Sequence, residues 1–227
     1  MNSQKEWEQE VRAVFEKMKA HKRKYSININ GVKLYIFPNV FSPKYFTDSK
    51  WFAQTVLKIV GQHSLLEIGT GTGIVALFAA LNGAKVSATE INPEAVENAK
   101  YNFQKHNVKV KTYCGDMYEP VPREKKFDFI FWNHPFNFGD DPNEEMLLKA
   151  GFDFQYENLE KYIAGAHLHL NPNGKLLLGT GNFALLSKVK EFATRYNYRI
   201  KLLKKTKIPL AADSFIDNDY RIYEFVK

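Results

Sequence analysis

The sequence predicts an α/β fold in which a doubly wound, mostly parallel sheet of seven strands carries helices on its faces. Short apolar runs, suited to strands buried on both faces, alternate with helical patterns over residues 63–196. A glycine-rich turn, Gly69-Thr-Gly71-Thr-Gly73, directly follows the first of these runs. Two later segments, residues 199–205 and 220–226, alternate apolar and polar side chains, which predicts an antiparallel pair that closes the sheet.

The length and composition are those of one domain in a reducing compartment. A chain of 227 residues with 44% hydrophobic residues suffices for one α/β domain with modest additions. No apolar run is long enough to span a bilayer, and the polar N-terminus MNSQKEWEQE has no secretory signal, so we expect a cytoplasmic protein without membrane contact. The single cysteine, Cys114, excludes an internal disulfide, and we expect its side chain to be buried in a strand.

The net charge of +7 is concentrated in two basic runs, residues 17–24 and 199–207. One interpretation is that these lysines lie on solvated faces. The other is that they attract a polyanion such as RNA or the ribosome. The sequence shows no aromatic–basic signature beside the runs, so both interpretations stay open.

The first part of the chain predicts a helix followed by a hairpin. Apolar residues recur at steps of three and four over residues 3–20, which is typical of an amphipathic helix that docks on the domain or on a partner. Residues 25–29 and 32–36 alternate around Asn30-Gly31, a strong hairpin signal. A loop rich in proline and aromatic residues then ends at Thr47-Asp48-Ser49, which offers N-cap side chains for a helix over residues 50–60.

Residues 63–92 form the central unit: strand, glycine turn, helix, strand. Ile74 to Leu81 is apolar and rich in alanine, as expected of a buried helix, and a second strand over residues 84–89 ends at Glu90. Adjacent parallel strands bring the glycine turn and Glu90 to one crevice, where a ligand can touch main chain and a carboxylate can accept both hydroxyls of a ribose. Glu67, just before the turn, suits a cationic ligand better than a pyrophosphate. A dinucleotide site would need a glycine at Ile74, so a nicotinamide oxidoreductase is disfavoured.

The remaining elements follow in the order expected for a doubly wound sheet. The predicted strands cover residues 108–114, 127–132 and 175–180, and the predicted helices cover residues 93–106, 159–170 and 183–196. The fourth strand delivers Asn133-His134-Pro135-Phe136 to the same edge as the glycine turn. The acidic connection over residues 137–157 is long enough to suggest a lid.

The segment Leu66-Glu67-Ile68-Gly69-Thr70-Gly71-Thr72-Gly73 resembles the first motif of the class I S-adenosylmethionine-dependent methyltransferases. The resemblance implies S-adenosylmethionine as cofactor, with its methionine part on the glycine turn and its ribose on Glu90. It also implies that Asp116 accepts the adenine amino group while Met117 lies against the ring, although ordinary turn chemistry explains these two residues equally well. The cofactor-binding residues expected are Glu67, Gly69, Thr70, Gly71, Gly73, Glu90, Ile91, Asp116, Met117 and Asn133.

Asn133-His134-Pro135-Phe136 resembles the Asn-Pro-Pro-Phe/Tyr tetrapeptide of methyltransferases that modify planar amide or exocyclic amino nitrogens. Such a nitrogen is a poor nucleophile because its lone pair is delocalised. The Asn133 side-chain oxygen and the main-chain carbonyl of residue 134 can hold its two hydrogens, and Phe136 can stack on a flat substrate. These four residues are the predicted catalytic set. His134 departs from the family's proline, and its imidazole could be a base, a substrate contact or a tolerated replacement.

The resemblance covers residues 38–227 and is closest to the release-factor glutamine methyltransferases and the small-domain methyltransferases of ribosomal RNA guanines. It implies a Rossmann-like core over residues 48–227, preceded by the helix, the hairpin and a cofactor-covering loop over residues 1–47, with Phe41, Ser42 and Pro43 near the site. We therefore expect an enzyme that N-methylates a protein or RNA, including substrates associated with the ribosome, and no metal site. The alternative is a non-catalytic module that binds the cofactor and docks on RNA or a protein.

Overall fold

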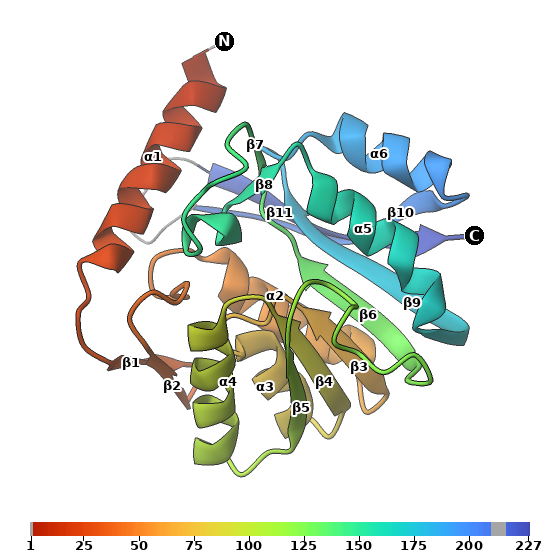
Figure 1. Cartoon of the computed structure of the whole chain (residues 1–227), viewed down its shortest axis with the longest axis horizontal. Coiled ribbons are helices and arrows are strands. Elements are labelled where there is room, and N and C mark those ends of the chain that lie inside the picture. Colours follow the sequence, from red (N-terminus) through yellow and green to blue (C-terminus); the bar gives the residue numbers. More distant parts are fainter. Residues whose placement is uncertain (1, 210–216) are drawn as a thin grey trace.

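The computed structural model describes residues 2–209 and 217–227 and contains the predicted seven-stranded sheet (Figure 1). The strand order is β10-β11-β9-β6-β3-β4-β5, and β11 runs antiparallel to both of its neighbours, β10 and β9. The strands of this sheet are β3 (Ser64–Ile68), β4 (Lys85–Glu90), β5 (Val110–Cys114), β6 (Phe127–Asn133), β9 (Leu170–Gly181), β10 (Arg199–Pro209) and β11 (Asp217–Val226). The predicted fold class and the antiparallel closing pair are confirmed.

Helices cover both faces of the sheet, and two small strand pairs lie outside it (Figure 1). The helices are α1 (Asn2–Lys19), α2 (Asp48–Val60), α3 (Ile74–Leu81), α4 (Pro93–Lys105), α5 (Glu157–Gly165) and α6 (Leu186–Arg195), with short 3-10 turns η1 (Leu148–Ala150) and η2 (Ala166–Leu168). The hairpin pairs β1 (Tyr25–Ile29) with β2 (Val32–Ile36), and β7 (Asn137–Gly139) pairs in parallel with β8 (Phe152–Phe154). None of the described helices is long and apolar enough to cross a membrane.

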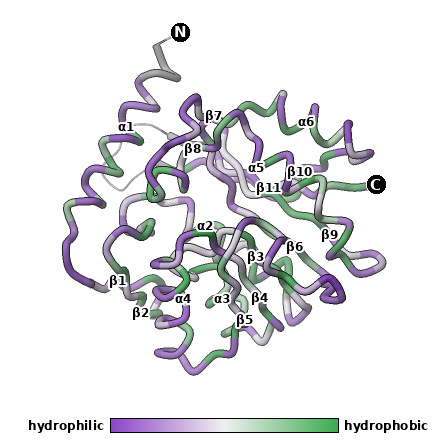
Figure 2. The backbone as a smooth tube through the Cα atoms, in the orientation of Figure 1, coloured by the Kyte–Doolittle hydropathy of each residue, from purple (hydrophilic) through white to green (hydrophobic). Residues whose placement is uncertain are grey.

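The strands of the core alternate their side chains between two apolar layers. Leu65 packs with α2, α3 and α4, whereas Leu66 packs with α5 and α6 on the opposite face, and neither side chain is exposed. This is the reason why β3 reads as a continuous apolar run. In Figure 2, α3 is largely green, as a helix enclosed by the core requires, while α1 alternates between green and purple.

The direction of winding reverses at β3, which pairs with β4 on one side and with β6 on the other. The chain winds outward through β4 and β5 and then returns to place β6 on the other side of β3. In open α/β sheets a crevice forms at such a reversal, at the carboxyl ends of the strands. The glycine turn after β3 and Asn133 at the end of β6 therefore meet at this point.

Three local predictions differ from the structure. Thr47 makes no cap bond from its side chain, and α2 begins at Asp48, two residues early. Cys114 is exposed, because β5 is an edge strand and this side chain faces solvent. The strand expected over residues 175–180 is longer in the structure, where β9 already starts at Leu170.

The hairpin is attached to the core through two buried asparagines of α4. Asn98 accepts from the Phe37 amide and donates to the Tyr35 carbonyl, each over 2.8 Å. Asn102 accepts from the Tyr35 amide over 2.8 Å and donates to the same carbonyl and to the carbonyl of Thr72, each over 2.9 Å. The two asparagine side chains make the hydrogen bonds with β2 and Phe37 that a neighbouring strand would otherwise make. These bonds fix the hairpin against α4.

Helix α1 packs on the core through its apolar stripe. Trp7 stacks on Phe183 with ring centroids 4.0 Å apart, and its indole nitrogen donates to Asn137 over 2.6 Å. The buried members of this cluster are Trp7, Val11, Val14, Phe15, Met18, Phe46, Leu147, Leu148 and Phe152. The predicted helix and its docking on the domain are confirmed.

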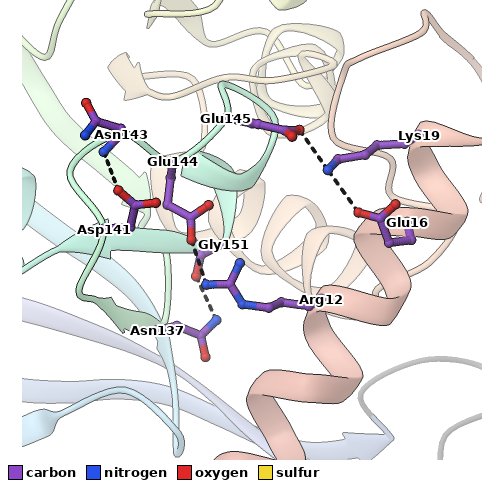
Figure 3. Close-up of polar contacts among 9 residues, drawn as sticks. All are labelled: Arg12, Glu16, Lys19, Asn137, Asp141, Asn143, Glu144, Glu145 and Gly151. Carbon is purple, nitrogen blue, oxygen red and sulfur yellow. Dashed lines mark hydrogen bonds and ion pairs between the residues drawn. The ribbon is translucent and has the colours of Figure 1, made fainter.

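Ion pairs join α1 to the acidic connection that follows β7 (Figure 3). Arg12 contacts Glu144 at 2.6 Å, and Lys19 contacts Glu145 at 2.7 Å and Glu16 at 2.9 Å. Arg12, Glu16 and Glu145 are substantially exposed and Lys19 is partly exposed, and exposed ion pairs contribute little to stability. The apolar stripe therefore provides most of the attachment.

A comparison of two glycines measures how tightly the glycine turn is packed. Gly73 and Gly31 share a φ of +83°, but a Cβ on Gly73 would lie 2.8 Å from the Phe103 ring, whereas one on Gly31 would meet nothing within 4 Å. Gly73→Ala should cost about 2–5 kcal/mol in the free energy of unfolding, from backbone strain plus overpacking. Gly31→Ala should cost only about 1–2 kcal/mol, from strain alone. Equal losses in urea denaturation would contradict the packing around Gly73.

The attachment of α1 is tested by separating its apolar and charged contacts. Trp7→Ala should cost about 3–5 kcal/mol, because it removes a fully buried indole, and should open α1 to limited proteolysis. Arg12→Ala, with an exposed side chain, should cost about 1 kcal/mol or less. If Arg12→Ala released the helix as readily as Trp7→Ala, the ion pairs would be the principal attachment.

Candidate active site

A cavity of about 200 Å³ lies at the carboxyl edge of the sheet, where the winding reverses. It is lined by the ends of β3, β4, β5 and β6 and is covered by α1, by the loop before α2 and by the segment around η1. The structure brings together here all but one of the predicted site residues: Glu67, Gly69, Thr70, Gly71, Glu90, Ile91, Asp116, Met117, Asn133, His134, Pro135 and Phe136. The exception, Gly73, lies behind the turn against Phe103 and Ala99.

Glu90 joins the end of β4 to the glycine turn. Its Oε2 accepts from the Gly71 amide over 2.8 Å, and its Oε1 accepts from the Asn92 amide over 2.9 Å. Each oxygen keeps one lone pair, so the carboxylate can still accept two hydroxyl groups. Burial raises the pKa of Glu90, while the backbone donors favour the ionised form.

Glu67 is the buried acid beneath the turn. Its Oε2 accepts from the Thr70 hydroxyl over 2.6 Å and from the Ala76 amide over 3.0 Å, so the carboxyl group ties β3 to the start of α3. Burial raises the pKa of Glu67 to about 8. A cation in the cavity would favour the charged form and lower this pKa, so the site is better suited to a positive ligand group than to a negative one.

Asp116 and Met117 line the far end of the cavity, after β5. Asp116 is paired with Lys161 of α5 at 2.8 Å, and this contact raises the pKa of the lysine. Met117 has a φ of 43°, a left-handed conformation that is uncommon for a residue with a side chain. Both residues line the cavity.

Asn133, the last residue of β6, is held by an acid from α2. Its Nδ2 donates to Asp48 Oδ2 over 2.8 Å. A carboxylate only accepts hydrogen bonds, so this contact fixes which end of the amide faces Asp48. The other end, Oδ1, is buried and has no hydrogen-bond partner among the residues that the structure describes. An unpaired buried acceptor costs about 1–3 kcal/mol, which a ligand donor in the cavity would recover.

The carboxyl group of Asp48 is buried at the N-terminus of a helix. Asp48 is 6% exposed and begins α2, where the helix N-terminus stabilises a negative charge. Burial raises the pKa of Asp48, and the hydrogen bond from Asn133 opposes that shift. The ionised carboxyl group can only accept hydrogen bonds, so the ionised form of Asp48 is the one that fixes the orientation of the Asn133 amide.

The imidazole of His134 is turned into the protein. It is 1% exposed, its Nε2 lies 2.8 Å from the Thr180 hydroxyl, and its ring contacts Trp132 and Tyr156 edge to face. Burial lowers the pKa of His134 to about 3, so the ring is neutral at pH 7 and is a weak base. Histidine has the same main-chain carbonyl group as the proline that it replaces at position 134.

Aromatic side chains enclose the cavity beside Asn133. Phe41 and Phe46 stack with ring centroids 5.3 Å apart, and Phe136 lies 6.1 Å from the Tyr220 ring. Phe41 and Pro43 line the cavity as predicted, whereas Ser42 is buried beneath the loop and its hydroxyl accepts from Tyr25. The enclosure suits a flat group.

Two contributions to the site were not recognised in the sequence. Asp48 was interpreted as part of a helix cap, and its contact with Asn133 joins positions 85 residues apart. Trp7, Val11 and Phe15 of α1 line the cavity, although their spacing shows only an amphipathic helix. Within the described residues no three His, Cys, Asp or Glu side chains gather to hold a metal ion.

Comparison with known proteins agrees with this geometry. Residues 31–196 match the family described as methyltransferase small domain. The chain is 28% identical over 192 residues to a putative protein N5-glutamine methyltransferase of Methanocaldococcus jannaschii, covering 81% of this chain and 93% of that one. It is 26% identical to a ribosomal RNA small subunit methyltransferase C of Haemophilus influenzae, covering 68% of this chain but 43% of that protein.

Solved structures have the same fold. A 16S rRNA N2 methyltransferase of T. thermophilus, in complex with AdoMet and guanosine, superposes with a TM-score of 0.64 at 20% identity, covering 90% of this chain and 50% of that one. A methyltransferase from Pyrococcus furiosus gives a TM-score of 0.58 at 27% identity, covering 81% and 86%. The family match spans most of the chain and includes both sequence motifs of the cavity. The chain therefore belongs to the methyltransferase small domain family and is an S-adenosylmethionine-dependent methyltransferase.

Proposed function

We propose that this enzyme transfers the methyl group of S-adenosylmethionine to a planar amide or exocyclic amino nitrogen of a protein or an RNA. The observation that carries the proposal is the buried Oδ1 of Asn133, which has no hydrogen-bond partner among the described residues, while Asp48 holds the other end of the same amide and Asn133 lines a cavity enclosed by aromatic rings. An acceptor oxygen in this position requires a donor from the substrate, and an amide or amino nitrogen brings two.

The residues of the cavity fit the cofactor. Glu90 would accept the ribose hydroxyls, and Asp116 and Met117 would receive the adenine ring. The glycine turn, with Thr70 and Glu67, would hold the positively charged methionine part, and Ile91 would border the ribose. When bound, the cofactor supplies an electrophilic methyl group on a sulfonium.

The residues of the protein would contribute to the reaction by positioning the substrate nitrogen. Asn133 Oδ1 and the carbonyl of residue 134 would each accept one hydrogen of the substrate NH₂ group, and Phe136 would stack on its plane. This arrangement aligns the nitrogen lone pair with the methyl group at about 3–3.5 Å and favours rehybridisation. A strong base is not needed, because the nitrogen becomes acidic as it bonds to carbon, and the low pKa of His134 agrees with a structural role for its ring.

The names of the relatives include glutamine and ribosomal RNA methyltransferases, which favours either a protein or an RNA as the methyl acceptor. Both substrate classes present a planar NH₂ group, so the same geometry serves either.

The exposed thiol of Cys114 fits a reducing, cytoplasmic location. A module that binds the cofactor without catalysis is disfavoured, because nothing in such a module would require an oriented and unpaired Asn133.

Removing the acceptor amide tests the proposal. Asn133→Ala should lower kcat at least about 100-fold, because the substrate nitrogen loses one of its two acceptors, while affinity for S-adenosylhomocysteine should persist. The measurement is transfer of labelled methyl from the cofactor to macromolecules in cell extract, with calorimetry for binding.

Asn158→Ala is the matched control, since Asn158 also lines the cavity and donates from its amide to an aspartate, Asp153, at 3.0 Å. It should retain most of the activity. Label recovered on carboxyl or hydroxyl oxygen in the wild-type product would refute nitrogen as the acceptor.

The role of Asp48 is visible in a pH profile. The pKa of Asp48 is raised, and the ionised form is the one that orients Asn133, so kcat should fall as pH decreases through that raised pKa. Asp48→Asn should lower kcat about 10- to 100-fold through misplacement of the amide, leave the KM for the cofactor nearly unchanged and flatten the acid limb.

Asp128→Asn, at the opposite end of β6, removes a carboxylate bonded to Ser64 and Asn171 and should leave the acid limb in place. A retained acid limb in Asp48→Asn would show that another group controls it.

A further inference from the structure

The hairpin and α4 carry an exposed surface of lysines and aromatic rings that the two basic runs did not reveal in the sequence. We define the lysine–aromatic face by six residues: Lys24, Lys33, Tyr35, Phe37, Tyr101 and Lys105. The three lysines are exposed and the three rings are partly exposed. These residues come from the end of the first basic run, from β2 and the residue after it, and from α4, so they meet only in the fold.

The geometry of the face interleaves cations and rings. Lys24 Nζ lies 4.3 Å from the centroid of Tyr101 and 5.7 Å from that of Phe37, and its ammonium donates to the Tyr101 hydroxyl over 3.1 Å. Lys33 lies 5.3 Å from the Tyr35 ring and Lys105 lies 5.3 Å from the Tyr101 ring. Tyr35 and Tyr101 meet edge to face, with centroids 5.2 Å apart.

The face is held in place by hydrogen bonds, and its charge is predominantly positive. Asn98 and Asn102 bond to the main-chain N–H and C=O groups of Tyr35 and to the amide of Phe37, so the rings of the hairpin are held at fixed positions over α4. Residues 20–47 contain five lysine or arginine residues and no aspartate or glutamate. On α4, Glu97 is paired with Lys100 at 2.9 Å, which reduces its effect on the face.

The face continues toward the cavity. Asn92, which lines the cavity, donates to the Asn39 carbonyl in the loop that leads from Phe37 to Phe41. Tyr101 is eight residues beyond Pro93, or about 12 Å along α4 from the end that borders the cavity. Lys44, in the same loop, lies over the rings of Tyr25 and Tyr45 at 5.7 and 5.2 Å. A chain bound along the face would therefore reach the cavity through a further group of lysine and aromatic side chains.

From this arrangement we propose that the lysine–aromatic face binds single-stranded RNA next to the methylated nucleotide, which makes an RNA base the acceptor of the proposed function. Lysines contact phosphates, and partly exposed rings stack on unpaired bases, and this combination is typical of single-strand binding. An acidic protein partner would use the lysines alone and would leave the rings without a role. The proposal rests on the proposed function only for the identity of the acceptor, since RNA binding at the face needs neither Asn133 nor turnover.

The test is fluorescence anisotropy with a short labelled single-stranded RNA and the full-length protein saturated with S-adenosylhomocysteine. The triple variant Lys24→Gln, Lys33→Gln, Lys105→Gln should weaken binding at least about tenfold at low salt and reduce the slope of log K against log salt by about 2, from three lost phosphate contacts. A matched triple variant of exposed lysines elsewhere, Lys85→Gln, Lys125→Gln, Lys190→Gln, should change neither quantity appreciably.

The rings are tested separately. Tyr101→Ala should weaken binding about 5- to 100-fold with little change in salt slope, whereas Tyr101→Phe, which keeps the ring and loses only the bond from Lys24, should bind nearly as wild type. Calorimetric binding of S-adenosylhomocysteine by each variant verifies that it is folded.

The outcomes separate the two proposals. Three results would each overturn the proposed RNA binding by the lysine–aromatic face and leave the methyltransferase account intact. They are equal losses of RNA affinity in the face and control variants, tighter binding of duplex RNA or polyglutamate than of single strands, and no RNA binding by protein that binds S-adenosylhomocysteine. RNA binding that depends on the face, together with a wild-type enzyme whose label is found on oxygen, would support the face and reject the proposed nitrogen chemistry.

Discussion

The hydrogen bond between Asp48 and Asn133 is the constraint on which the chemistry of this site depends. An amide side chain has two ends of similar shape, and only one of them can accept the hydrogens of a substrate nitrogen. The buried carboxylate of Asp48 binds the donor end at 2.8 Å, and the acceptor end, Oδ1, is left without a partner among the described residues. The fold supports this contact from two directions, because β6 places Asn133 at the reversal of the sheet and α2 begins with Asp48.

The local and periodic features of the chain were predictable from its sequence, and the contacts between distant segments were not. The glycine turn, the acid at the end of β4 and the tetrapeptide after β6 each depend on a few consecutive residues, so the sheet edge that unites them could be inferred from strand order alone. The Asp48–Asn133 contact spans 85 positions and the Lys24–Tyr101 contact spans 77, and no periodicity encodes either.

Individual residues show why a local sequence pattern does not always predict the environment of a side chain. Cys114 stands in an apolar–polar alternation that suggested burial, but the edge position of β5 leaves one of its faces to solvent. Gly73 belongs to the motif, yet its role is to let Phe103 and Ala99 approach the turn. The departure from the family at His134 has a physical explanation in the structure, since the ring fills a buried aromatic space and bonds to Thr180.

The most direct test of the central claim is a crystal structure with sinefungin, a cofactor analogue that carries an amino group where the methyl group would be. The account predicts that this amine donates to Asn133 Oδ1 within about 3.2 Å while Nδ2 remains bonded to Asp48. An Asn133 side chain that is turned away from the amine, or that presents its Nδ2 to it after leaving Asp48, would contradict the account.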